Sequence, residues 1–168
     1  MIRTLLFIIF VLSVTCCSST KPKTQPPALK PDTILKELTD FKGAPFILPK
    51  QKPQLQILEF WASWCAPCRE AMPHMDRLYR QYRNKGLSVI AVNVDENPND
   101  ALSIIAQMRP QFSVAWDPYG EVQHAFGVST LPTTVILDKT GQPLMRLSGF
   151  TPENQKLIHH QIEMYLNP

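Results

Sequence analysis

Three runs of mostly apolar residues limit the fold of this chain more than any other feature of its sequence. They span residues 55–61, 87–94 and 133–137. Strands that are apolar on both faces lie in the middle of a sheet that helices cover on both sides. The runs therefore predict a sheet with a helical layer on each face.

Three further segments carry apolar side chains every three or four residues, which is typical of a helix with one buried face. These side chains are Met72, Met75, Tyr79 and Tyr82; Ala101, Ile105 and Met108, within residues 99–108; and Ile158, Ile162 and Tyr165. Thr151 and Pro152 suit the N-cap and the first position of the last helix. Short strands are expected at residues 113–116 and 144–148, the second as a hairpin return. This alternation predicts an α/β fold with a mainly parallel sheet and an antiparallel edge.

Composition favours one domain and excludes some classes of protein. The chain has 168 residues, a net charge of +3 and no basic run, so we expect no nucleic-acid partner. Its four cysteines are too few for a disulfide scaffold.

The first 17 residues have the pattern of an export leader. One positive charge followed by about ten apolar residues, from Leu5 to Val14, matches a secretory signal. A membrane span would need roughly 20. Cys16 and Cys17 follow the apolar run and resemble a bacterial lipoprotein site, at which the cysteine is acylated. The alternatives are a cleaved soluble form and an uncleaved anchor.

Residues 18–31 are rich in proline and small polar residues, which keep a chain extended and cannot build a core. We interpret them as a linker that holds the folded domain, residues 32–168, away from a bilayer. A disordered tail without a role is the alternative.

Cys65 and Cys68 directly follow the first apolar run and begin the first predicted helix. Unpaired backbone N–H groups and the positive end of the helix dipole favour a thiolate there. A spacing of two residues lets the pair close a disulfide or resolve a mixed one, and Pro67 fits the first helical turn. The alternatives are a zinc half-site, for which the predicted domain has no other cysteine, and a purely structural disulfide.

Three segments and one glycine give the chain a resemblance to thioredoxin-fold proteins. Residues 60–69 resemble the active-site segment, residues 92–95 the following strand, and residues 126–134 the segment with the cis-proline of the family, here Pro132. Gly149 falls where the family has a glycine before its last helix. An additional helix and strand between Asp95 and Pro132, with the leader, is similar to the extracytoplasmic TlpA/ResA group.

The resemblance implies a thioredoxin fold, with a mixed sheet flanked by helices and a helix–strand insertion before the cis-proline. It implies a thiol–disulfide oxidoreductase without cofactor or metal, in which an exposed Cys65 attacks a protein disulfide and a buried Cys68 releases the product. Trp64, Ala66 and Pro67, with Thr130 and Leu131, would bind the substrate. A disulfide-forming oxidant or peroxide-linked protein, and a binding or chaperone module, are the alternatives.

The same resemblance implies partners and a compartment. We expect protein thiols and disulfides as substrates, an upstream dithiol electron donor at the membrane, and a monomer. The enzyme would be tethered to the membrane in the bacterial cell envelope or periplasm. Members of the group are often reductants for cytochrome c maturation or for other thiol proteins.

Glu59 is an acid in the middle of the first apolar run. Burial would raise the pKa of its carboxyl group and suit it to relay a proton to Cys68. TlpA/ResA proteins commonly have Asn at this position and Glu at the position of Ala71, whereas thioredoxins have a buried acid where Glu59 stands. The alternative is an edge glutamate that faces solvent, and Glu70 is expected at the surface.

Other side chains have simpler interpretations. Trp61 belongs to the core or to the docking surface, and Trp116 to the core or a cleft wall. His74 is expected on an exposed helix face, with a catalytic role as the alternative. Met72, Met75 and Met108 are expected in the core and not at a copper site.

Overall fold

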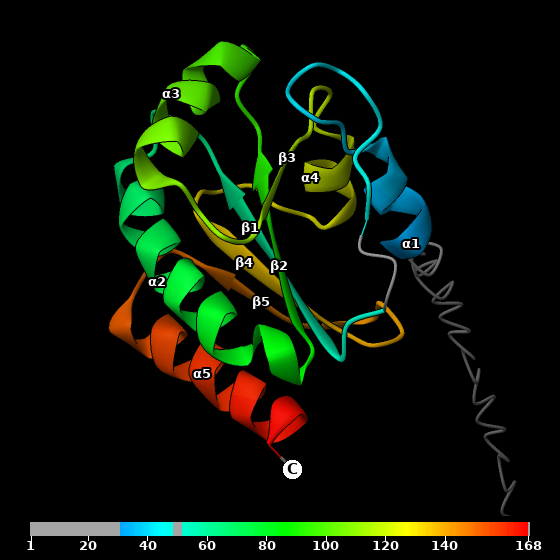
Figure 1. Cartoon of the computed structure of the whole chain (residues 1–168), viewed down its shortest axis with the longest axis vertical. Helices are drawn as coiled ribbons and strands as arrows, with labels where there is room; N and C mark the ends of the chain where they lie inside the picture. The colour runs from blue at the N-terminus through cyan, green and yellow to red at the C-terminus, as the bar shows by residue number, and fades with distance from the viewer. Residues whose placement is uncertain (1–30, 49–51, 168) are drawn as a thin grey trace, which may run out of the picture.

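The computed structural model of the chain describes residues 31–48 and 52–167. The predicted leader, residues 1–17, and the predicted linker up to residue 30 lie outside this part of the chain. Among the described residues, no helix is both long enough and apolar enough to span a bilayer. The elements are, in chain order, α1 (Pro31–Ile34), η1 (Leu35–Glu37), β1 (Leu55–Trp61), α2 (Ala66–Tyr82), η2 (Arg83–Lys85), β2 (Leu87–Asn93), α3 (Pro98–Met108), β3 (Ser113–Trp116), α4 (Glu121–Ala125), β4 (Thr133–Asp138), β5 (Pro143–Ser148) and α5 (Pro152–Leu166) (Figure 1).

The five strands form one mixed sheet in the order β3-β2-β1-β4-β5. β1 is parallel to β2 and β2 to β3, whereas β4 is antiparallel to both β1 and β5. All residues of β1 and β2 are buried, as their continuous apolar runs predict. The predicted α/β fold with an antiparallel edge is confirmed.

Alternate side chains of β1 point to opposite faces of the sheet. Leu55, Ile57 and Trp61 join one apolar cluster with residues of α2, α3 and α5. Leu58 and Phe60 join a second cluster with residues of η1 and α4. Figure 1 shows α2 and α5 together on one side of the sheet and α1 with α4 on the other. Glu59 is two residues after Ile57 and two before Trp61, so its side chain lies on the same face of the sheet as theirs, the face that α2 covers.

The prediction that Tyr165 faces the core is wrong. In α5 the buried row is Ile158, Ile162 and Leu166, whereas Tyr165 is 37% exposed. This row follows a spacing of four residues, so the last turn directs Leu166 to the sheet.

The N-terminal part of the domain closes one edge of the sheet, which the sequence did not predict. Thr39 pairs with Pro45 and with Trp116 of β3. The backbone N–H of Thr39 donates to the Trp116 carbonyl at 2.9 Å, and the Trp116 N–H donates back at 2.8 Å. The free side of β3 is thereby covered.

Candidate active site

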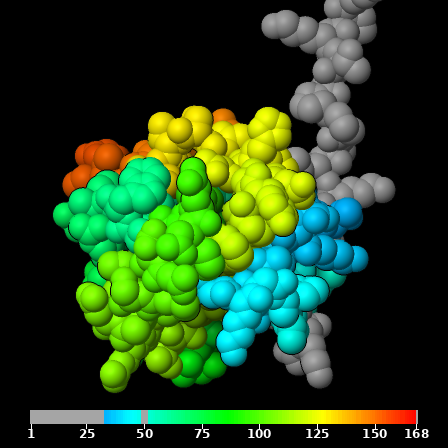
Figure 2. Space-filling view, turned by 90° about the horizontal axis from the view of Figure 1, so that it is seen from above, coloured from blue at the N-terminus to red at the C-terminus, as the bar shows by residue number. Residues whose placement is uncertain are grey.

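The candidate active site lies at the end of the sheet where the parallel strands terminate. β1 ends at Trp61 and the chain enters α2 at Ala66. β4 runs the opposite way, so its first residue, Thr133, lies at the same end. Figure 2 views this end, with the teal segment that begins α2 near the green segment after β2 and the yellow segment before β4.

Cys65 and Cys68 are joined by a disulfide. Cys65 is the N-cap of α2, and its sulfur accepts a hydrogen bond from the backbone N–H of Cys68 at 3.3 Å. The N–H groups at this helix end favour negative charge, so the reduced Cys65 would be stabilised as a thiolate. In this disulfide state Cys65 is 4% and Cys68 1% exposed. The prediction of an exposed Cys65 is therefore wrong for the disulfide state, in which both cysteines are buried.

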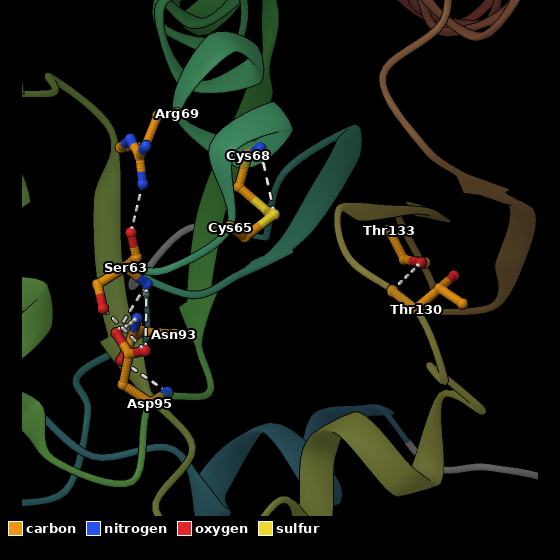
Figure 3. Close-up of a disulfide and its surroundings, with 8 residues drawn as sticks. All are labelled: Ser63, Cys65, Cys68, Arg69, Asn93, Asp95, Thr130 and Thr133. Carbon is orange, nitrogen blue, oxygen red and sulfur yellow. Dashed lines mark hydrogen bonds between the residues drawn. A yellow bond between two sulfur atoms is a disulfide. The ribbon is translucent and has the colours of Figure 1, made fainter.

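A polar cluster of Ser63, Asn93 and Asp95 holds the loop that precedes Cys65 (Figure 3). The buried Asp95 carboxylate accepts hydrogen bonds from the Ser63 N–H at 2.9 Å, the Ser63 hydroxyl at 3.1 Å and the Asn93 amide at 2.8 Å. The Arg69 guanidinium donates to the Ser63 carbonyl at 2.7 Å. Ser63 is therefore fixed from both sides, two residues before the cysteine.

No role for Asp95 is predicted from the sequence. The sequence feature that points to it is a pair of polar residues, Asn93 and Asp95, at the carboxyl end of a buried strand. That end of β2 lies beside the end of β1, because the two strands are parallel and Trp61 pairs with Asn93.

Glu59 is buried on the α2 face of β1, at 1% exposure. Its Oε2 accepts a hydrogen bond from the Thr134 hydroxyl at 2.7 Å. Burial raises the pKa of Glu59 from 4.5 to about 7, and the Thr134 hydrogen bond opposes this rise. The alternative of a solvent-facing edge residue is excluded. Ala71 is buried on α2, and Glu70 is exposed as expected.

The five residues expected to bind substrate lie in the two loops that carry the disulfide and the proline. Trp64 is 71% exposed, Ala66 and Pro67 are exposed in the first turn of α2, Thr130 is exposed and Leu131 is half-buried. In Figure 3 the disulfide is drawn between the polar cluster on one side and the segment of Thr130 and Thr133 on the other.

The peptide bond between Leu131 and Pro132 is cis. Two hydrogen bonds hold the loop around it: the Thr133 hydroxyl donates to the Thr130 carbonyl at 2.7 Å, and the Gly149 N–H donates to the Pro132 carbonyl at 2.8 Å. Within the described part of the chain, the backbone N–H and carbonyl of Leu131 have no hydrogen-bond partner. They are available to pair with an added strand.

The remaining predicted positions divide between core and surface. Trp61 is fully buried, so it belongs to the core and not to the docking surface. The Trp116 indole is partly buried and donates to the Asp95 carbonyl at 2.8 Å. His74 is half-buried against the ring of Phe150, not exposed as expected, and burial lowers its pKa. Met72 and Met75 are buried and Met108 packs against the same core.

A metal site is not evident at these positions. Across residues 31–48 and 52–167, no three His, Cys, Asp or Glu side chains group so as to hold a metal ion.

Comparison with known proteins identifies relatives of this chain. The AhpC/TSA family matches residues 30–142. The thiol–disulfide oxidoreductase ResA of Bacillus thuringiensis subsp. konkukian is 36% identical over 129 residues, which cover 77% of this chain and 71% of the relative. ResA of Geobacillus kaustophilus is 34% identical over 119 residues, with 71% of this chain and 67% of the relative covered.

Solved structures show the same fold. A protein of Chlorobium tepidum assigned as a thiol:disulfide interchange protein DsbE aligns with a TM-score of 0.66 and 37% identity, covering 68% of this chain and 82% of that chain. StoA of Bacillus subtilis aligns with a TM-score of 0.58 and 26% identity, covering 71% of this chain and 92% of that chain.

Proposed function

Because the chain belongs to the TlpA/ResA-like thiol–disulfide oxidoreductases of the AhpC/TSA family, we propose that its Cys65–Cys68 pair reduces disulfides of proteins outside the cytoplasm. The observation on which this rests is the position of the pair. Cys65 caps α2, where the backbone favours its thiolate, and Cys68 lies one turn away and within bonding distance of it.

Reduction of a substrate proceeds by two exchanges of sulfur atoms. The Cys65 thiolate attacks one sulfur of the substrate disulfide, forming a mixed disulfide and releasing the other substrate sulfur as a thiolate. Cys68 then loses its proton and attacks the Cys65 sulfur, which releases the second substrate thiolate. Two electrons pass from the enzyme to the substrate, and the enzyme ends with the disulfide found here.

Glu59 is the proposed acceptor of the Cys68 proton. Its carboxyl group is buried on the sheet face that α2 covers, and a pKa of about 7 suits proton transfer in both directions at neutral pH. Ala71 supplies no carboxylate on α2 and Glu70 is exposed, which leaves Glu59 to act alone.

The loop at Pro132 is the proposed docking site for the substrate backbone. An extended substrate would pair with Leu131 as an added strand and contact Trp64, Ala66, Pro67 and Thr130.

Replacement of Pro132 by alanine is expected to raise KM for a protein disulfide several-fold, because the loop would no longer hold the backbone N–H and carbonyl of Leu131 in position for the substrate. The pKa of the Cys65 thiol should change little. Steady-state kinetics combined with a thiolate titration tests this, and a shifted pKa with unchanged KM would contradict it.

The direction of the reaction predicts the redox potential of the pair. As a reductant, the pair should have a potential near that of thioredoxin, about −270 mV, and far below that of the oxidant DsbA, about −120 mV. Equilibration of the purified protein with glutathione or dithiothreitol buffers measures it. A value near the DsbA potential would favour the disulfide-forming alternative.

We also propose that the leader exports the protein and that acylation of Cys16 or Cys17 tethers it to the membrane. There it would act as a monomer and receive electrons from a membrane dithiol protein. The support is the short apolar run with a proline-rich segment after it. An acyl chain on the amine in addition to the thioether-linked lipid provides the two signals that stable anchoring requires.

Mass spectrometry of the mature protein tests the tether. The expected N-terminus is a lipidated cysteine at position 16 or 17. An unmodified N-terminus after residue 17 would contradict acylation while remaining consistent with export.

A further inference from the structure

Thr134 of β4 is the cross-strand partner of Glu59 in β1. Both side chains are buried, and the Thr134 hydroxyl donates to Glu59 Oε2 at 2.7 Å. Within the described residues it is the one hydrogen-bond donor to this carboxyl group. We infer that Thr134 is a positioning residue of the proton relay, which holds Oε2 and stabilises the ionised form of Glu59, leaving Oε1 to exchange the proton with Cys68. This inference rests on the proposed role of Glu59.

Among residues 31–48 and 52–167, no charged side chain shifts the pKa of Glu59. On β2 its neighbour is the apolar Ala91. The titratable side chains of α2 and α5 that are not exposed are His74, Asp76, Tyr79, Tyr82 and Glu163; Cys68 carries no charge in the disulfide. None of them contributes to the shift in the pKa of Glu59, which has two causes: burial raises it and the Thr134 hydrogen bond lowers it. Within the part of the chain that the structure describes, the Thr134 hydroxyl is therefore the one polar group that opposes the effect of burial on this pKa.

A donor aimed at a carboxylate favours the charged form and weakens proton binding. Without it the carboxyl group would hold its proton to a higher pH, and less Glu59 would be ionised at neutral pH to accept the proton of Cys68. A hydrogen bond to a charged group is strong enough to shift the pKa by about one unit. Thr134 would thus set the pH above which the relay works.

The test compares wild type with Thr134→Val, which keeps the shape and removes the donor, and with Thr134→Ser, which restores it. The oxidised proteins are labelled with ¹³C at the glutamate carboxyl group, and the pKa of Glu59 is measured by NMR titration; Glu59→Gln assigns the signal. We expect Val to raise the pKa by about one unit and Ser to return it close to wild type. Thr134→Ala serves if the valine variant does not fold.

An unchanged pKa of Glu59 in the valine or alanine variant would overturn the inference. The pH profile of disulfide reduction, recorded for the same variants, separates this from a failure of the proposed relay. We expect its acidic limb to move to higher pH with the pKa. A pKa that shifts without any movement of this limb would contradict a proton-transfer role for Glu59, and with it the assignment of Thr134 to the relay.

Discussion

Replacement of Cys65 by serine is expected to lower the rate of substrate disulfide reduction to the uncatalysed rate. Cys68→Ser is expected to trap the enzyme as a mixed disulfide with its substrate. The reason is that the thiolate at the N-cap of α2 makes the first attack. Without Cys68 the mixed disulfide at Cys65 forms but is not resolved from within the enzyme. Non-reducing electrophoresis of each variant incubated with a disulfide-containing protein should show the adduct with Cys68→Ser only.

Alkylation of the reduced wild type provides an independent measurement of the same assignment. Iodoacetamide at neutral pH should label Cys65 before Cys68, because the helix end stabilises the Cys65 thiolate. Faster labelling of Cys68, or an adduct with Cys65→Ser, would reverse the roles of the two cysteines.

Replacement of Glu59 by glutamine is expected to slow turnover by about 10- to 100-fold, within the lower part of the range for general acid–base catalysis. Glutamine is similar in shape and can still accept the Thr134 hydrogen bond, but it cannot take the proton from Cys68. Steady-state rates of wild type and variant between pH 6 and 9 test this. Turnover equal to wild type across this range would contradict the relay.

The same substitution should change how stability depends on pH. The pKa of Glu59 rises from 4.5 to about 7 on folding, so the folded state binds this proton more tightly than the unfolded state. The contribution of Glu59 to the free energy of unfolding therefore falls as the pH rises from 4.5 to 7, by about 3 kcal/mol in total. Glutamine does not titrate, so Glu59→Gln lacks this loss. Between pH 4.5 and pH 8, the free energy of unfolding of the variant should rise by about 3 kcal/mol relative to that of the wild type.

Urea denaturation of the oxidised proteins at the two pH values measures this change in relative stability. Glu70→Gln is a suitable control, because Glu70 is exposed on α2 and should give no such pH dependence. A constant difference between Glu59→Gln and wild type at both pH values would show that Glu59 titrates normally.

Long periodic elements of this fold were predictable, because their signal is local. The apolar run 55–61 corresponds to β1, and the spacing from Met72 to Tyr82 lies within α2. By contrast, α4 has five residues, too few for a helical period to be visible. The edge formed by Thr39 depends on pairing with Trp116, 77 residues away.

The site divides in the same way. The cysteine pair and the proline loop are local motifs, and a lone acid in an apolar strand marked Glu59. Its partner Thr134 was concealed within the apolar run 133–137, because only the register of β1 and β4 places it opposite Glu59. Asp95 likewise acts on Ser63, 32 residues earlier in the sequence.

The most direct test of whether the Cys65–Cys68 pair transfers electrons to protein disulfides is the reduction of insulin by dithiothreitol. The turbidity of the released B chain measures the rate of this reaction. The wild-type protein should accelerate the reaction at catalytic concentrations, and the double variant Cys65→Ser with Cys68→Ser should not. No acceleration by folded wild type, in which both thiols have been titrated after reduction, would contradict the assignment as a thiol–disulfide oxidoreductase.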